Sequence, residues 1–348
     1  MILPGSQTAV LILLIAGMLG WALWANAFKA AGGTWRFELF YFDFAIGVLL
    51  AATALALTAG SLGFDGFSFA DDLRLAGKRQ ELFGFVAGVI FNLGNMLLLA
   101  AISVTGMAVA FPAGMGFAMV IAALWNFALN PGGNAAFLFV GAVVVFAAIV
   151  FDILAFKTWS ADKLKTQAEA TGKTRKRKPS SKGVFLSLAG GLLLGSFAPL
   201  IQMGREGENG LGPYSIGFMF AVGVLFSTFV FNLFFMNLPV QGAPVDMAQY
   251  FSAKVTRHGL GLLGGIVWYV GMIASLIAGR VEGAARVAAP VTYALGQGGI
   301  VIAALCGLFL WREYAGANAG VKIRVGLMLF LLLAGIGLFT AGVETART

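Results

Sequence analysis

The sequence predicts an all-α polytopic membrane protein with ten transmembrane helices, arranged as a 5+5 inverted repeat. Three observations predict it: an apolar composition, ten long apolar segments, and short motifs that recur in both halves. The chain has 348 residues, of which 59% are hydrophobic and 11% are charged. Because soluble domains carry about 25% charged residues, this composition excludes a soluble enzyme, a disordered chain and a disulfide scaffold.

Each of the ten apolar segments is long enough to cross a bilayer, whose hydrocarbon core needs about 20 apolar residues per helix. The segments span residues 8–27, 42–62, 82–104, 107–129 and 134–156, and then 184–204, 214–236, 259–279, 284–311 and 325–342. None alternates apolar and polar residues with period two, so none is a β-barrel strand. No basic residue precedes Lys29, which predicts an uncleaved first helix and not a secretory signal.

The longest connection, residues 157–183, divides the chain into a first five-helix half (1–156) and a second five-helix half (184–348). A glycine pattern of the third segment recurs in the eighth, as Gly84-x3-Gly88-x5-Gly94 and Gly261-x3-Gly265-x5-Gly271. An odd number of spans per half places the halves in opposite orientations, as in the inverted repeats of many secondary transporters. We therefore expect a substrate site near the membrane midplane, between the halves.

Most of the net charge of +8 lies in the connection 157–183, which holds nine Lys or Arg and two Asp or Glu. On a ten-helix topology, 16 of the 23 basic residues fall on the face with this linker. The positive-inside rule then predicts a cytoplasmic linker and external termini, in a plasma (inner) membrane. The expected partners are the lipid bilayer and a small-molecule substrate, without nucleic acid, and the protein is expected as a monomer or homodimer.

Residues for metal or covalent chemistry are scarce. One cysteine, Cys306, and one histidine, His258, provide neither a disulfide nor a metal site, so we expect no metal and no cofactor. Residues 172–174 (Gly-Lys-Thr) resemble the end of a phosphate loop, but that motif needs a glycine five residues earlier, where the chain has Gln167. We therefore expect neither nucleotide binding nor an enzyme, and we assign no catalytic residue.

Several motifs resemble, in kind and order, those of the ureide permease family: Tyr41-x-Asp43, Gly60-Ser61-Leu62-Gly63, Leu93-Gly94-Asn95 and Trp311-Arg312-Glu313-Tyr314. This family belongs to the drug/metabolite transporter superfamily, near the glucose/ribose and rhamnose sugar porters. The resemblance implies ten helices, inverted repeats, a cytosolic central loop and proton-linked movement of small polar solutes. Plant members carry ureides, uracil and related oxo-heterocycles.

Polar side chains inside a bilayer are costly, so each is a candidate for function. Asn92 and Asn95 share a helix face, and their amides suit a ligand with alternating N–H and C=O groups or a sugar. Interhelical hydrogen bonding is the structural alternative. Trp21 and Trp24 are expected to anchor the first helix at the interface. The other substrate-binding candidates are Gln202, Trp268, Tyr269, Tyr293 and Gln297.

Proton coupling needs a titratable group within the membrane. Asp43 is the acid that lies deepest in an apolar run. We expect it to bind the proton or the ligand, unless a partner such as Arg36 holds it in a salt bridge. Asp152 is expected at the membrane surface, and Glu313 in an ion pair at a helix end.

The function that follows is secondary active, proton-coupled symport of a small polar metabolite, such as a ureide, nucleobase or sugar, by alternating access. A multidrug, amine or amino-acid exporter of the same superfamily is the alternative. A membrane-embedded enzyme would need clustered His, Asp or Glu, and a channel would need a repeated selectivity ring. The sequence contains neither feature.

Overall fold

The computed structural model describes residues 1–63, 67–129, 134–171 and 181–344, which form helices and loops and contain no strand. The long helices of the first half are α1 (Gln7–Ala30), α2 (Phe37–Leu57), α4 (Lys78–Thr105), α5 (Met107–Leu129) and α6 (Ala135–Thr171). Those of the second half are α7 (Lys182–Arg205), α8 (Pro213–Asn237), α10 (Val255–Ala278), α11 (Ala289–Leu305) and α12 (Ala319–Glu344). The short helices are α3 (Phe69–Leu75), α9 (Met247–Phe251) and a 3₁₀ turn (Gly283–Ala285), and a π-helical segment (Cys306–Leu310) follows α11.

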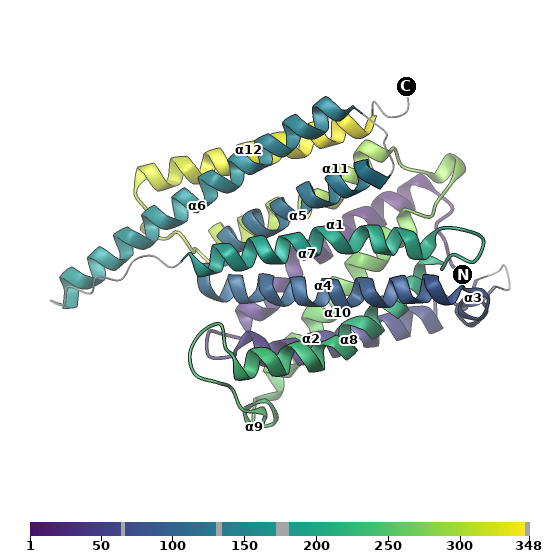
Figure 1. The fold of residues 1–348 in the computed structure, drawn as a ribbon, viewed down its shortest axis with the longest axis horizontal. Helices are drawn as coiled ribbons and strands as arrows, with labels where there is room; N and C mark the ends of the chain where they lie inside the picture. The colour runs from purple at the N-terminus through teal and green to yellow at the C-terminus, as the bar shows by residue number, and fades with distance from the viewer. Residues whose placement is uncertain (64–66, 130–133, 172–180, 345–348) are drawn as a thin grey trace.

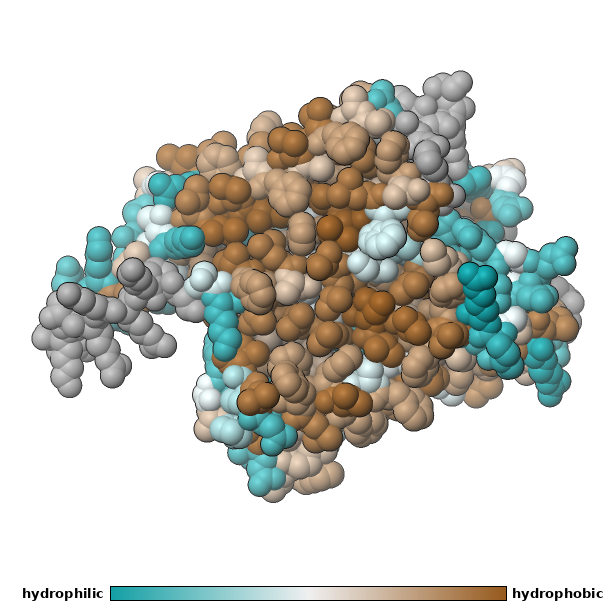
Figure 2. Space-filling model, viewed as in Figure 1, coloured by the Kyte–Doolittle hydropathy of each residue, from teal (hydrophilic) through white to brown (hydrophobic). Residues whose placement is uncertain are grey.

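Ten of the described helices are long and apolar enough to cross a membrane, which confirms the predicted all-α fold with ten spans. Figure 2 shows a broad apolar band with hydrophilic residues gathered at its two ends. Within the band, large side chains such as Phe226, Val230 and Leu233 of α8 are exposed. In a bilayer these side chains contact lipid, where their exposure carries no hydrophobic cost.

The helices run between two faces of the molecule (Figure 1). We call the face where α6 ends and α7 begins the linker face; it also carries α9. We call the opposite face, where α1 begins and α12 ends, the terminus face; it also carries α3. Each long helix begins at one face and ends at the other, so both hydrophilic ends of the band are made of helix ends and loops.

Helix boundaries differ from the predicted segments where polar residues continue a helix or a proline starts one. α6 extends through the first part of the predicted linker to Thr171, because residues such as Lys, Ala, Gln and Glu favour helix. Residues 172–180, with the Gly-Lys-Thr motif, lie outside the described residues. α11 begins at Ala289 with Pro290 in its first turn, a position that needs no proline N–H.

Packing between helices repeats when the two halves are exchanged. α4 packs on α7 and α8, and its counterpart α10 packs on α1 and α2. The last helices of the two halves, α6 and α12, pack on each other, and each is preceded by an asparagine that caps it. The side-chain oxygens of Asn134 and Asn318 accept hydrogen bonds from Ala136 and Val321. This pattern is what a 5+5 inverted repeat predicts, and the repeat itself stays a prediction.

Glycines allow the closest of these helix contacts. A Cβ added at Gly88 of α4 would overlap the Phe220 carbonyl oxygen of α8, and one added at Gly265 of α10 would overlap the Phe44 carbonyl oxygen of α2. Without a hydrophobic force between helices in lipid, such small residues let backbones approach and gain van der Waals contact. The predicted glycine motifs are therefore helix-packing faces.

We predict that Gly265→Ala destabilises the protein, because the added methyl group overlaps the α2 backbone, which cannot move aside. Overpacking of this kind lowers the free energy of unfolding by about 1–3 kcal/mol. Thermal unfolding of the purified protein measures the effect. Gly326→Ala is the matched control, because no heavy atom lies within 4 Å of a Cβ added there. Equal stability of the two variants would contradict the packing account.

Candidate substrate-binding site

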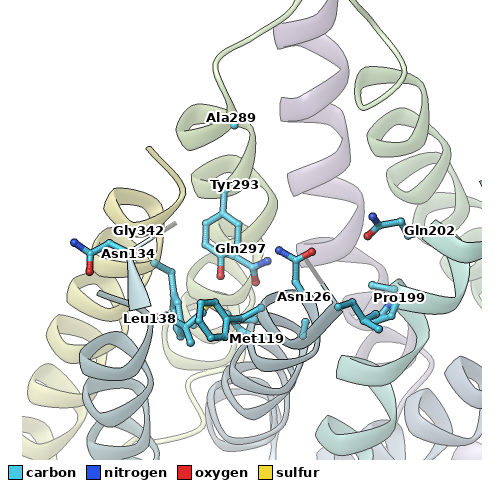
Figure 3. Close-up of a pocket in the computed structure, with 16 residues that line it drawn as sticks. Met119, Asn126, Asn134, Leu138, Pro199, Gln202, Ala289, Tyr293, Gln297 and Gly342 are labelled. Atoms are coloured by element: carbon cyan, nitrogen blue, oxygen red, sulfur yellow. The ribbon is translucent and has the colours of Figure 1, made fainter. Parts of the chain in front are cut away.

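A cavity of about 480 Å³ lies at the terminus face, between the end of α5, the end of α7 and the start of α11. Figure 3 shows Asn126, Tyr293 and Gln297 gathered near its centre, with Asn134 and Gln202 on either side. Asn126 was not among the predicted candidates, because it lies at the end of an apolar segment where a polar residue is unremarkable in sequence. We call this space the outer cavity.

A second, deeper pocket of about 140 Å³ continues from the outer cavity. The two share four lining residues, Met119, Ala122, Ala198 and Gln297. Helices α1, α4, α5, α7, α10 and α11 surround this inner pocket. Its walls are mostly apolar, and the aromatic lining residues are Trp21, Trp24, Phe91, Phe111, Phe197 and Trp268. A solute that enters from the terminus face therefore meets polar side chains first and aromatic rings afterwards.

The aromatic walls are held in place by neighbouring rings. Trp268 of α10 stacks on Phe220 with ring centroids 5.6 Å apart and lies 4.2 Å from Phe91. Trp24 packs against Phe44 at 5.1 Å and is 2% exposed. The expectation that Trp21 and Trp24 anchor the membrane interface is wrong. α1 is rotated so that both indoles face the helix bundle, and this rotation is not visible in a uniformly apolar sequence.

Each of the two cavities has one buried polar group without a hydrogen-bond partner in the described part of the chain. They are the indole nitrogen of Trp21 and the hydroxyl of Tyr293, both buried. A buried donor without a hydrogen bond is costly, so both groups are available to a ligand. Tyr293 and Gln297 lie one turn apart on α11, as their spacing predicts, and Gln297 lines both the outer cavity and the inner pocket.

The two predicted asparagines of α4 have different surroundings. Asn95 lines the inner pocket, and its amide nitrogen donates to the Tyr41 hydroxyl at 3.1 Å. Asn92 is fully buried away from the pocket, and its amide donates to Ser227 at 2.8 Å and to Thr228 at 3.1 Å, both on α8. Asn92 therefore joins helices, whereas Asn95 is oriented by Tyr41 at the pocket wall.

The remaining predicted binding residues also include some that line a cavity and one that is buried between helices. Trp268 lines the inner pocket, and Gln202 lines the outer cavity, where it donates to Glu206, the residue that follows α7, at 2.8 Å. Tyr269 is fully buried, with its hydroxyl close to Gly217 of α8, and it lines neither cavity. Of the seven predicted binding residues, the structure brings five to the two connected cavities and leaves Asn92 and Tyr269 in the helix packing.

Asp43 lies outside both cavities, near the linker face. Its carboxylate accepts a hydrogen bond from the Tyr250 hydroxyl at 2.6 Å and lies 2.9 Å from the Nδ1 of His258. Arg36, the partner considered from the sequence, instead pairs with the buried Glu38. Burial, then the hydrogen bond to Asp43 and its charge, raises the pKa of Tyr250. Tyr250 therefore remains a hydrogen-bond donor.

The expectation that Asp152 lies at the membrane surface is wrong. Its side chain is 0% exposed, and neither carboxylate oxygen has a hydrogen-bond partner among the described residues. The reason is that α12 packs along α6 and covers this stretch of the helix, where the neighbouring Ala155 is also fully buried. The expected ion pair of Glu313 is present, with Lys29 at 2.7 Å.

Neither the outer cavity nor the inner pocket is lined by Asp, Glu, Lys or Arg. Within residues 1–63, 67–129, 134–171 and 181–344, no three His, Cys, Asp or Glu side chains are grouped as metal ligands are. The site thus offers aromatic faces and neutral hydrogen-bonding groups. Such a lining suits a small, uncharged polar solute.

Ten helices that can span a membrane, six of which surround a pocket that connects to one face, are typical of a polytopic membrane transporter. The comparison with known families agrees. The family model described as "Sugar transport protein" matches residues 67–340, which is most of the chain. The chain belongs to this family, a family of transporters of small metabolites and not of enzymes.

The chain is also similar to two plant permeases. It is 20% identical to Ureide permease 1 of Arabidopsis thaliana over 349 residues, which cover 86% of this chain and 88% of the relative. It is 21% identical to Ureide permease 2 of the same plant over 357 residues, with the same coverage of both chains. These matches confirm the resemblance to the ureide permease family.

A solved crystal structure shares the fold. It aligns with 99% of this chain and 100% of its own chain, at a TM-score of 0.53 and 14% sequence identity. At this identity the likeness concerns the fold alone.

We predict that Asn92→Ala lowers stability, because it removes the two interhelical hydrogen bonds to α8. Polar contacts of this kind in membranes contribute about 0.6–2 kcal/mol. Thermal unfolding in detergent measures the loss. Asn126→Ala is the control, since Asn126 is exposed at the outer cavity. If Asn92→Ala unfolds at the same temperature as the control, Asn92 does not hold α4 to α8.

Proposed function

We propose that this protein is a secondary active transporter that carries a small neutral solute through the inner pocket by alternating access. The observation that supports this most is the pocket itself, which has aromatic walls and an oriented amide and connects only to the terminus face among the described cavities. In this state a solute has access from one side of the membrane. The opposite state would open the pocket to the linker face.

The substrate class we propose is a planar, amide-bearing molecule such as a ureide or a nucleobase. Indole and phenyl faces stack on flat rings, and the walls carry Trp21, Phe91 and Trp268 on several sides. The Asn95 amide can both donate and accept hydrogen bonds, which matches alternating N–H and C=O groups. The names of the plant relatives, ureide permeases 1 and 2, point in the same direction.

A sugar is the second candidate, because the family is described as sugar transport proteins. Each hydroxyl of a sugar needs a partner when it leaves water, and an unpaired one costs affinity. The inner pocket offers few polar side chains, chiefly Asn95, Gln297 and the Trp21 indole. This scarcity favours a ureide or nucleobase over a hexose. Aromatic cages also bind quaternary ammonium groups, so an amine belongs in any screen.

The orientation we propose places the linker face in the cytoplasm of a plasma (inner) membrane. The Lys and Arg excess on this face supports it through the positive-inside rule. The pocket in this structure is then open to the outside. The basic linker 157–183 connects the two five-helix halves on the cytoplasmic side.

Asp43 is the proton-coupling residue that we propose. The titratable groups that face it are His258 of α10 and Tyr250 of α9, and both contact its carboxylate. The Nδ1 of His258 lies within hydrogen-bond distance of both Asp43 carboxylate oxygens, so an acid and a base meet in one cluster through which a proton can pass. Gly261 of α10 permits this contact, since an added Cβ would overlap the Asp43 Cβ.

The substrate is tested by thermal-shift measurement of the purified protein with ureides, nucleobases, hexoses and cationic amines, followed by uptake into proteoliposomes. We predict that Asn95→Ala raises KM for the best ligand about tenfold or more, since a lost hydrogen bond of about 1.4 kcal/mol is a factor of ten. Asn237→Ala, at the exposed end of α8, is the matched control. Unchanged uptake by Asn95→Ala would remove Asn95 from the site.

We predict that Asp43→Asn abolishes the dependence of uptake on pH, because the neutral amide cannot gain or lose the proton. Uptake is measured across about pH 5 to 8, with and without an imposed pH gradient. Glu169→Gln, at an exposed position near the end of α6 at the linker face, is the control and keeps the wild-type profile. A wild-type protein whose transport never responds to pH would contradict proton coupling.

A further inference from the structure

Two contacts lie on the linker-face side of the inner pocket. Lys29 Nζ, at the end of α1, lies 2.7 Å from a carboxylate oxygen of Glu313. One turn earlier on α1, Asn26 accepts a hydrogen bond from the Trp311 indole nitrogen at 2.7 Å. Trp311 and Glu313 both belong to the loop that follows the π-helical segment. These two contacts tie α1 to that loop, and we call them the inner closure.

Glu313 also fixes this loop to the start of α5. Its two carboxylate oxygens accept hydrogen bonds from the backbone N–H groups of Met107 at 2.9 Å and of Ala108 at 2.7 Å. A carboxylate is stabilised there, because the first N–H groups of a helix have no partner within the helix. The Glu313 side chain is 10% exposed. Glu313 therefore stays bound to α5, and Lys29 is its second partner, which comes from α1.

Beyond the inner closure lies a third cavity, of about 300 Å³, at the linker face. Its lining includes Phe28, Lys29 and Trp311, which also surround the closure. On α1, Trp24 lines the inner pocket and Lys29 lines this third cavity. Five residues of helix correspond to about 7.5 Å along the axis, so only a thin layer separates the two spaces.

Helix α4 also passes from the inner pocket to the third cavity within a few residues. Leu98 lines the inner pocket, whereas Ile102 and Ser103 line the third cavity. Two helices on different sides of the pocket thus place the layer at the same depth.

The backbone next to Glu313 has features that suit movement. The π-helical segment Cys306–Leu310 interrupts the regular hydrogen bonding of α11, and π-helical turns occur frequently at functional sites. Arg312, directly before Glu313, has a φ of 49°, a left-handed conformation that residues with a Cβ rarely adopt. The loop that carries Trp311 and Glu313 is thus joined to α11 by irregular backbone.

We propose that Lys29 and Glu313 form the inner gate of the transport pathway, and that the third cavity is the exit vestibule on the linker face. This inference rests on the proposed alternating access. When the gate opens, Lys29 leaves Glu313 and turns into the vestibule, which it already lines with a side chain that is 24% exposed. Glu313 stays on the two N–H groups of α5, so neither charge is left buried without a partner.

The gate is tested by labelling a reporter cysteine from each side of the membrane. The background is the full chain with Cys306→Ser, because Cys306 is the one native cysteine. Met115→Cys, in the wall of the inner pocket, is the reporter. A membrane-impermeant maleimide is added to one face of sealed proteoliposomes of known orientation. The experiment needs no substrate, so it does not depend on which solute is carried.

With Lys29 present, we expect labelling from the terminus face and slow labelling from the linker face. Lys29→Met should increase the linker-face rate at least tenfold, because Glu313 keeps its α5 partners and only the cross-pocket contact is lost. Lys29→Arg keeps the charge and should stay closed. Lys78→Met is the matched control, since it breaks an exposed pair with Glu81 at 2.8 Å on the opposite face.

If Lys29→Met and Lys78→Met label equally slowly from the linker face, the pair is not a gate. If Lys29→Met does not fold, Asn26→Ala tests the same layer by removing the acceptor of the Trp311 indole, and an unchanged rate there overturns the proposal. Absence of labelling from the terminus face in the parent protein would contradict the proposed access route instead. The two failures are therefore distinguishable, because the linker-face rates alone decide the gate.

Discussion

Close approach of helix backbones at glycine is the interaction on which the rest of this structure depends. In lipid, helices gain little from hiding apolar side chains, so association depends on van der Waals contact and polar pairs. Gly88 and Gly265 bring α4 onto α8 and α10 onto α2 in the same manner. The same α4 and α10 also line the inner pocket, together with α1, α5, α7 and α11, so these tight contacts hold two of its walls in place.

Polar side chains buried within the spans or at their ends have three different uses. Asn92 joins helices, Asn95 is oriented at the pocket wall, and Glu313 holds a loop to the start of α5. Asp43 differs from all three, since its carboxylate contacts both the hydroxyl of Tyr250 and the imidazole of His258 near the linker face. Asp152 is the exception, because it is fully buried and no hydrogen bond in the described structure stabilises its carboxyl group.

The fold was predictable because the bilayer imposes it: a backbone in lipid must satisfy its own hydrogen bonds, so each long apolar segment becomes a spanning helix. Asn95, Trp268 and Gln297 were predictable as costly or unusual groups in such segments. The indoles of Trp21 and Trp24 and the pairing of Asp43 with His258 were not. They depend on how each helix is rotated, and hydropathy does not encode rotation when both faces of a helix are apolar.

The central claim is that the substrate occupies the inner pocket. A structure of the protein determined with the ureide or nucleobase that gives the largest thermal shift tests it most directly. The account predicts a ligand between Trp21 and Trp268, with a polar atom at about 2.7–3.2 Å from the Asn95 amide. A ligand confined to the outer cavity, without contact to Asn95, or one bound beside Asp43, would contradict it.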